Sequence, residues 1–493
     1  MRIFEILLLA TLLTGVVLLF LPAARRPAWR QALPWLGLAL IALHLLIEGY
    51  RWQMVPAYAL TAILLLAGLR ARAAAPPPAS RWRTALRITG ATLCVLIVVI
   101  AAAASWLFPV FELPMPSGPH AVGTAYLHLT DSAREESFTE DQNDHRELMV
   151  QLWYPTDAAS GSPAPYLQDP RQIGRRMAHD LRVPPFLFDH FNLIRTHATL
   201  DAALAPGGAR YPVLIFSHGY AQGVMGQNTV QMQELASHGY VVASIAHPYE
   251  GLLAIFPDGH AIPAKREHLD AFRNEMGPLV KPWAEAKTAE EKDARFREWV
   301  AGAHLAAASV KLWAEDTSFV IDELTRLNAE RFGQLLDLER IGVFGMSFGG
   351  TTAGQVCLDD PRVKAGLNLD GTQLGEVLGH ALRQPFMFMY NSNGGGDRMN
   401  HLIYEQAAGP AYQVTVAGTT HFSYTDFSLW SPAFRMLGLL GPIEGPRMQQ
   451  IMNAYVLAFF NRYLKGGDST LLDAASPDYP EVRLESRNAG AAP

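Results

Sequence analysis

The sequence predicts two parts of different fold class: an all-α transmembrane region over residues 1–108 and an α/β domain over residues 109–493. The first part holds nearly all of the long apolar runs of the chain. In the second part, short buried strands alternate with helical segments, which is the rhythm of a mostly parallel central sheet with helices on both faces. Several of these strands run directly into Gly-rich or polar turns, so candidate functional residues gather at strand ends.

The composition limits the classes of function. Only 17% of the 493 residues are charged and the mean hydropathy is +0.08, which is unusual for a wholly soluble protein. The formal net charge of −6, without a Lys/Arg-rich run outside the membrane-flanking loops, argues against nucleic acid as a partner. The two cysteines, Cys94 and Cys357, predict neither a disulfide framework nor a cysteine metal site, and no H-E-x-x-H or C-x-x-C spacing occurs.

Four apolar runs predict about four transmembrane helices, at residues 3–21, 33–47, 54–69 and 88–108. A helix needs about 20 apolar residues to cross a bilayer core, and the first and fourth runs reach this length. The second and third runs are shorter and also fit a re-entrant pair. A cleaved signal peptide is disfavoured, because further apolar runs follow and no clean small-residue cleavage site precedes Arg25 and Arg26.

Loop charges orient this region. Two groups of arginines flank the runs, one after the first run and one before the fourth: Arg25, Arg26 and Arg30, then Arg70, Arg72, Arg81, Arg83 and Arg87. The positive-inside rule places both groups in the cytoplasm, so we expect the N-terminus and the α/β domain on the periplasmic or extracellular side. The Ala/Arg/Leu-rich composition suggests a bacterial inner membrane. Glu5 and His44 are too sparse to predict a transport path.

The α/β domain is expected to open with a Pro/Gly-rich entry segment at residues 113–123. An alternating strand is predicted at 147–154, and no role is assigned to the loop-rich residues 158–208. Buried strands and two helices then follow in a regular order: strands at 211–217, 240–246, 341–346, 363–369, 385–390 and 412–417, with helices at 231–238 and 447–464.

Residues 263–338 interrupt this order. They are polar and charged, with helical periodicity at 290–299 and 310–327. This stretch is too long for a plain crossover between neighbouring strands, so part of it is expected to be a helical insertion that forms a lid or entrance wall. The alternative is an extra pair of surface helices without contact to substrate.

The most informative motif is Gly345-Met346-Ser347-Phe348-Gly349, which follows the apolar run at 341–344. This G-x-S-x-G pattern predicts a tight strand-to-helix turn that exposes one hydroxyl on a strained backbone. Glycine suits both ends of the turn because a Cβ there would crowd the neighbouring backbone. Ser347 is therefore the candidate nucleophile. On the motif alone, a chance Gly/Ser turn is an equal alternative.

A serine hydroxyl needs a base to take its proton, and the imidazole of His421, which follows the strand at 412–417, is the best candidate. A carboxylate behind the imidazole would fix its tautomer. Asp370 and Asp397 both follow strands after the serine, and the residues alone do not decide between them. Serine, acid and histidine in this chain order are typical of the α/β-hydrolases, which is the fold class we predict.

Two backbone N–H groups are expected to form an oxyanion hole. Phe348 N–H lies at the start of the helix after the serine, and the loop after Phe216-Ser217-His218-Gly219 supplies Tyr220 N–H as the second donor. We expect His218 to hydrogen-bond beneath that loop. A structural role is at least as good an interpretation of His247.

Several motifs together resemble the platelet-activating factor acetylhydrolase family, plasma/intracellular type II, within the α/β-hydrolase superfamily. They cover roughly residues 109–465: Leu113-Pro-x-Pro-Ser-Gly-Pro with Val122-Gly, Phe216-Ser-His-Gly, Gly345-x-Ser-Phe-Gly-Gly, Leu369-Asp370-Gly and Gly418-x-x-His-x-x-x-x-Asp. The resemblance implies Ser347 as nucleophile, Asp370 rather than Asp397 as acid, and His421 as base, with Tyr220 and Phe348 as oxyanion donors. It also implies a calcium-independent, cofactor-free esterase.

The resemblance further implies that the enzyme removes short or oxidised acyl groups, including sn-2 acyl groups of phospholipids. Two departures bear on the substrate: Met346 stands where the family often has histidine, and Ala246-His-Pro replaces a more charged stretch. The sequence thus predicts a membrane-anchored, outward-facing serine esterase like 1-alkyl-2-acetylglycerophosphocholine esterase. Alternatives are a broad carboxylesterase or polyester hydrolase, a lipase, an acyltransferase, and a membrane interaction protein with an inert hydrolase domain.

Overall fold

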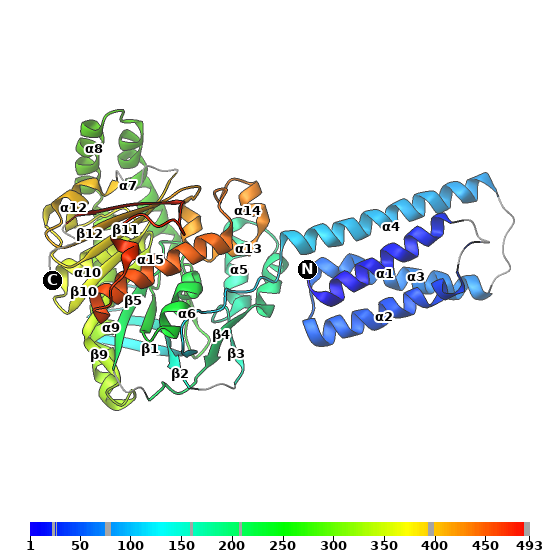
Figure 1. The fold of residues 1–493 in the computed structure, drawn as a ribbon, viewed down its shortest axis with the longest axis horizontal. Helices are drawn as coiled ribbons and strands as arrows, with labels where there is room; N and C mark the ends of the chain where they lie inside the picture. The colour runs from blue at the N-terminus through cyan, green and yellow to red at the C-terminus, as the bar shows by residue number, and fades with distance from the viewer. Residues whose placement is uncertain are drawn as a thin grey trace. The chain divides into compact units, whose positions relative to one another are not determined.

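The computed structural model describes residues 1–21, 25, 27–73, 80–157, 161–206, 210–392 and 399–487 (Figure 1). The chain forms two compact units. The first comprises Met1–Glu112, Pro170–Ile194 and Trp430–Ala433, and the second comprises Leu113–Asp169, Arg195–Leu429 and Phe434–Pro493.

The first unit contains four apolar helices that run alongside one another (Figure 1): α1 (Ile3–Phe20), α2 (Leu33–Leu43), α3 (Val55–Ala73) and α4 (Arg81–Leu107). Three helical stretches are long and apolar enough to cross a membrane, namely Ala28–Glu48, Trp52–Arg70 and Arg81–Leu107, whereas Ile3–Leu18 is shorter. From the sequence we expected the first and fourth runs to reach full length and the second and third to be shorter. The second is longer than expected because two short helical turns extend α2 at its ends, η2 (Ala28–Ala32) and η3 (His44–Glu48).

Polar side chains of this unit are paired with one another. Arg51 donates from Nη1 to Glu5 Oε1 (2.6 Å), and His44 Nε2 lies 3.4 Å from the same oxygen. The stretch at 158–208, to which the sequence assigned no role, contributes α5 (Pro170–Leu181) and η5 (Pro185–Leu193) to this unit. There the ring of Phe186 packs edge-on against Trp52, with centroids 5.0 Å apart.

The second unit is built on an eleven-stranded sheet in the order β13-β12-β11-β10-β9-β5-β6-β2-β1-β4-β3. The adjacent central strands are mutually parallel: β12, β11, β10, β9, β5 and β6. The outer pairs β2–β6, β1–β2, β3–β4 and β12–β13 are antiparallel. The bounds are β1 (Ala121–Glu135), β2 (His145–Thr156), β3 (Pro163–Pro165), β4 (Arg195–Leu200), β5 (Tyr211–Ser217), β6 (Val241–Ala246), β9 (Leu336–Met346), β10 (Val363–Leu369), β11 (Phe386–Asn391), β12 (Ala411–Val416) and β13 (Val482–Arg487). The expected mixed α/β fold with a mostly parallel sheet is therefore confirmed. A small hairpin, β7 (Leu253–Ile255) with β8 (Ala261–Pro263), lies outside this sheet.

Helices cover both faces of the sheet. Alternate residues of β5 point into two different cores, Val213 and Ile215 into one and Leu214 and Phe216 into the other. The first core is completed by α9 (His304–Glu330) and α10 (Phe348–Asp359), and the second by α6 (Thr229–Ser237) and α15 (Gly445–Lys465). Burial on both faces explains the continuous apolar character of the central strands.

Residues 266–330 form three helices, α7 (Arg266–Glu285), α8 (Ala289–Gly302) and α9. Trp283 and Trp299 pack between α7 and α8 with ring centroids 5.9 Å apart. The remaining short elements connect the strands: η4 (Trp52–Met54) in the first unit, then η6 (Met225–Asn228), η7 (Val377–Gly379), α12 (His401–Gln406), η8 (His421–Tyr424), α13 (Phe427–Trp430), α14 (Pro432–Met436) and η9 (Thr470–Leu472).

Candidate active site

Ser347 lies on a strained turn between β9 and α10. Its backbone has φ +56° and ψ −117°, a conformation that L-residues rarely adopt. A Cβ on Gly345 would lie 2.2 Å from the carbonyl carbon of Gly349, and a Cβ on Gly349 would lie 1.9 Å from the carbonyl oxygen of Ser217. Only glycine fits at both positions, so the G-x-S-x-G spacing is dictated by sterics.

Three predicted side chains meet beyond the carboxyl ends of parallel strands of the sheet. His421 Nε2 lies 3.0 Å from Ser347 Oγ, and His421 Nδ1 lies 2.7 Å from Asp370 Oδ2. Ser347 follows β9, Asp370 follows β10, and His421 begins η8 after β12. This is a hydrogen-bonded chain through which a base could take the serine proton.

Asp370 is held in a single orientation. Asn391 donates to Oδ1 from its backbone N–H (2.8 Å) and reaches both carboxylate oxygens with Nδ2 (2.9 and 2.7 Å). The side chain of Asp370 is 1% exposed, whereas that of His421 is 42% exposed. In this series of hydrogen bonds, the carboxylate is therefore buried and the imidazole is partly open to solvent. Asp397, the alternative acid, lies outside the described residues.

The loop after β5 lies against Ser347, and two of its backbone N–H groups have acceptors. Gly219 N–H donates to Gln227 Oε1 (2.7 Å), and Ala221 N–H donates to the carbonyl of Glu250 (2.7 Å). Within the described residues, neither Tyr220 N–H nor Phe348 N–H has a hydrogen-bond acceptor. Phe348 is the first residue of α10, where N–H groups lack an intrahelical partner. The rings of these two residues pack with centroids 4.9 Å apart.

His218 is fully buried beneath this loop, as the sequence led us to expect. Its Nδ1 donates to Gly219 O (2.8 Å), and its Nε2 accepts from His247 N–H (3.3 Å). Burial, reinforced by His247, lowers the pKa of His218 to about 3. The imidazole is therefore neutral at physiological pH and is held in one tautomer.

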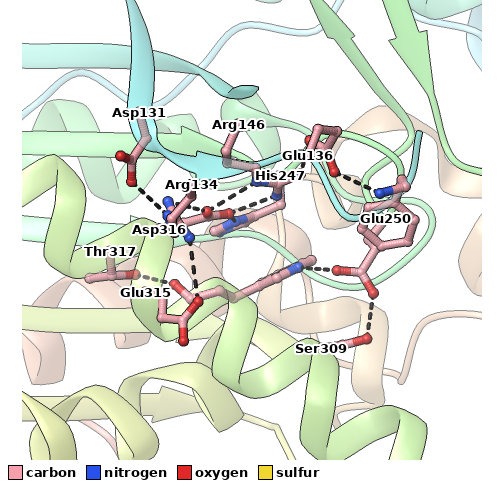
Figure 2. A network of polar contacts seen from close by, with 12 residues as sticks. Asp131, Arg134, Glu136, Arg146, His247, Glu250, Ser309, Glu315, Asp316 and Thr317 are labelled. Atoms are coloured by element: carbon pink, nitrogen blue, oxygen red, sulfur yellow. Dashed lines mark hydrogen bonds and ion pairs between the residues drawn. The ribbon is translucent and has the colours of Figure 1, made fainter. Parts of the chain in front are cut away.

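A second Ser–His–Asp arrangement lies in the interior, and Figure 2 shows its His247 and Asp316. Ser217 Oγ donates to His247 Nε2 (3.1 Å), and His247 Nδ1 donates to Asp316 Oδ2 (2.8 Å). These residues are 3%, 1% and 0% exposed, so substrate does not reach this serine. Ser217 also ends a regular strand rather than a strained turn.

Arginine side chains hold the inner arrangement together. Arg146 contacts both oxygens of Asp316 (3.1 and 2.8 Å), and Arg134 contacts Oδ1 (3.0 Å), as Figure 2 shows. Burial alone would raise the pKa of Asp316, but Arg146 and His247 hold it well below its usual range. Burial lowers the pKa of His247. The structure thus keeps a neutral imidazole between a carboxylate and a hydroxyl.

Sequence reasoning missed Asp316, Arg146 and Glu250. His247 was visible because it follows a strand directly, whereas Asp316 lies inside a long helix, where periodicity marks it only as one more polar position. The partnership depends on how α9 packs on the sheet, which no local pattern encodes.

One group of potential metal ligands occurs among the described residues, in the first unit. Glu5, His44 and Glu48 offer ligand atoms within 4.8 Å of one another. Arg51 and Arg2 already pair with Glu5 (2.6 and 3.4 Å), which opposes a further cation there.

The chain is similar to known proteins over most of its length. The family model described as "Platelet-activating factor acetylhydrolase, isoform II" matches residues 107–471. Curated relatives include the platelet-activating factor acetylhydrolases of Cavia porcellus (24% identical, covering 71% of this chain and 78% of the relative) and Gallus gallus (25%, covering 72% and 84%). A probable 1-alkyl-2-acetylglycerophosphocholine esterase of Arthroderma benhamiae is 25% identical and covers 80% of this chain and 98% of the relative.

Among solved structures, a ferulic acid esterase from Streptomyces cinnamoneus superposes with a TM-score of 0.60 at 28% identity. The superposition covers 76% of this chain and 99% of the esterase. Together with the mostly parallel sheet, this likeness is consistent with an α/β-hydrolase fold.

The buried neutral state of His218 predicts a pH dependence of stability. The unfolded chain binds a proton on this histidine below its ordinary pKa of about 6.5, whereas the folded chain does so only near 3. The free energy of unfolding should therefore be highest above pH 6.5. It should fall by up to about 1.4 kcal/mol per pH unit as the pH drops toward 3.

Denaturant titrations of the full chain in detergent at pH 7.5, 6, 5 and 4 measure this slope. His218→Gln should flatten it, and His179→Gln, at a side chain that is 68% exposed, should leave it unchanged. Equal slopes for wild type and His218→Gln would contradict the neutral buried state.

Proposed function

This chain belongs to the family of platelet-activating factor acetylhydrolase, isoform II, and is an ester hydrolase; we propose that it is a membrane-anchored serine esterase that works through an acyl-enzyme. The observation that most supports this is the hydrogen-bonded chain from Ser347 through His421 to Asp370 at the strained turn. We assign Ser347 as nucleophile, His421 as general base and then general acid, and Asp370 as the carboxylate that orients the imidazole.

In the proposed reaction, Ser347 Oγ attacks the ester carbonyl while His421 Nε2 takes the hydroxyl proton. Negative charge then develops on the carbonyl oxygen, where the N–H groups of Tyr220 and Phe348 would stabilise it. The alcohol leaves with the proton from His421, and the acyl group remains on Ser347. Water, deprotonated by His421, attacks the acyl-enzyme and releases the acid. Asp370 stays ionised and stabilises the imidazolium formed at each step.

The substrate class we favour is a short-chain or oxidised acyl ester, including the sn-2 acyl groups of phospholipids. The names of the relatives support this choice, since one is called a platelet-activating factor acetylhydrolase and another a probable 1-alkyl-2-acetylglycerophosphocholine esterase. The second candidate is a broad carboxylesterase. The likeness to a ferulic acid esterase at 28% identity favours it.

We further propose that residues 1–108 anchor the enzyme in a bilayer and that the catalytic domain, residues 109–493, lies on the outer side. The three long apolar helices support anchoring. The side follows from the arginine-rich loops and the positive-inside rule.

Labelling with a fluorophosphonate tests the nucleophile, because this reagent phosphonylates only an activated serine. We expect labelling of the wild type and none of Ser347→Ala, while Ser217→Ala is labelled like the wild type. A p-nitrophenyl ester series from acetate to palmitate then tests the substrate class. Activity that falls with chain length supports the acetylhydrolase-like assignment, and a long-chain optimum would replace it with a lipase.

Asp370→Asn should lower kcat by about 10⁴, because an amide cannot stabilise the imidazolium and favours the wrong tautomer. Asp397→Asn is the matched control and should keep the wild-type kcat. Both values come from p-nitrophenyl acetate hydrolysis. The reverse outcome would reassign the acid to Asp397.

Reporter fusions test the topology. A periplasmic reporter such as alkaline phosphatase fused after Pro109 should be active, and the same reporter fused within the first arginine-rich loop, after Arg25, should be inactive. Activity only in the second fusion would overturn the proposed orientation.

A further inference from the structure

Tyr220 is held at two points by one buried residue, Glu250. The phenol oxygen of Tyr220 donates to Glu250 Oε1 (3.2 Å), and the next backbone N–H, that of Ala221, donates to the Glu250 carbonyl (2.7 Å). Glu250 is 0% exposed. The residue proposed as an oxyanion donor is therefore fixed through its side chain and through the peptide that follows it.

The other donors to the Glu250 carboxylate come from the helices at 266–330. His268 on α7 places Nε2 2.9 Å from Oε1, and Trp313 on α9 donates from Nε1 to Oε2 (2.7 Å). Ser309 on α9 also donates to Oε1, a contact that Figure 2 draws. Among the described residues, the only ion-pair partner of Glu250 is His268. A buried carboxylate without an arginine or lysine depends on hydrogen-bond donors of this kind.

Aromatic packing joins the same elements. Phe272 on α7 stacks on the ring of Tyr220, with centroids 4.2 Å apart and an interplanar angle of 23°. The ring of Trp313 lies 6.2 Å from that of Tyr220. Both helices thus contact the oxyanion loop through Tyr220 or through Glu250.

The peptide between Gly219 and Tyr220 is fixed from its other side by His218, whose Nδ1 donates to Gly219 O. In a trans peptide, the N–H of Tyr220 points opposite to that carbonyl. The direction of Tyr220 N–H is therefore set by His218 before it and by Glu250 after it. Tyr220 N–H itself has no acceptor among the described residues.

We propose that Glu250 is a positioning residue that couples helices α7 and α9 to the oxyanion hole by anchoring Tyr220. The inference rests on the proposed function, in which Tyr220 N–H stabilises the oxyanion. It assigns to the insertion a part in the chemical step, because a displacement of α7 or α9 would move an oxyanion donor. An error of about 1 Å in such a donor is enough to lower a rate by roughly 10²-fold.

Tyr220→Phe tests the anchor with the smallest change, since it removes the hydroxyl and keeps the ring and the backbone N–H. We expect kcat for p-nitrophenyl acetate to fall roughly tenfold, with KM and the melting temperature close to wild type. Tyr240→Phe is the matched control. It removes a tyrosine hydroxyl that donates to Asn461 Oδ1 (2.8 Å) on α15, and it should leave kcat unchanged.

Ser309→Ala tests the same carboxylate from the insertion. It should also lower kcat severalfold, and the double variant with Tyr220→Phe should lose less than the product of the two single losses, because both act through Glu250. Wild-type kcat in both single variants, or multiplicative losses in the double variant, would overturn the inference. So would a loss seen only in KM or melting temperature.

Fluorophosphonate labelling separates this inference from the proposed function. If wild type is not labelled at Ser347, the proposed function fails and the inference falls with it. If wild type is labelled and hydrolyses the ester while Tyr220→Phe is indistinguishable from it, the coupling alone is wrong.

Discussion

The close approach between the turn at Ser347 and the end of β5 is the constraint on which the site depends. Gly349 lies so near the carbonyl of Ser217 that a single methyl group would meet it at 1.9 Å. This contact brings α10, which carries Phe348, against the loop that carries Tyr220. Tyr220 and Phe348, from segments far apart in the sequence, thereby come together beside Ser347, with their rings 4.9 Å apart. The strained φ of Ser347 is tolerated because β9, β10 and α10 hold the turn from three sides.

Burial distinguishes the two Ser–His–Asp arrangements more clearly than their hydrogen bonds do. The distances around Ser347 and around Ser217 are nearly the same, 3.0 and 2.7 Å against 3.1 and 2.8 Å. Only the first has a partly exposed histidine and a free pair of N–H groups nearby. The second is enclosed, and arginines neutralise its carboxylate. We therefore interpret it as internal support for the strand that leads into the oxyanion loop.

The sequence was sufficient for features that are local along the chain. Ser347 was singled out as a candidate because the sterics of the turn require glycine two residues before and after it, and His421 because it lies in the turn after a strand. The central parallel strands were recognised because burial on both faces makes them continuously apolar.

Features that depend on distant packing were not predicted. The residues alone left Asp370 and Asp397 open, because both follow strands after the serine and their distances to His421 depend on how the sheet is assembled. Glu250 and Asp316 have hydrogen-bond partners that only the packing of α9 brings to them. The sequence placed the segment at 170–194 in the α/β domain without a role, whereas its contacts group it with the first unit. The edge strands β4 and β13 were also missed, since short, partly exposed strands carry little periodicity.

The helices at 266–330 do not behave as one removable cover, although the sequence left a lid and a surface helix pair as alternatives. Helix α9 is part of the main core and contributes Asp316 to Arg146 and Trp313 to Glu250. Separating Arg146 from Asp316 would break two hydrogen bonds of a fully buried ion pair, which is strongly destabilising. Helices α7 and α8 carry mostly exposed residues and make fewer polar contacts with the sheet. Helix α9 is therefore a fixed wall against which Glu250 is held, and α7 touches the same site through His268 and Phe272.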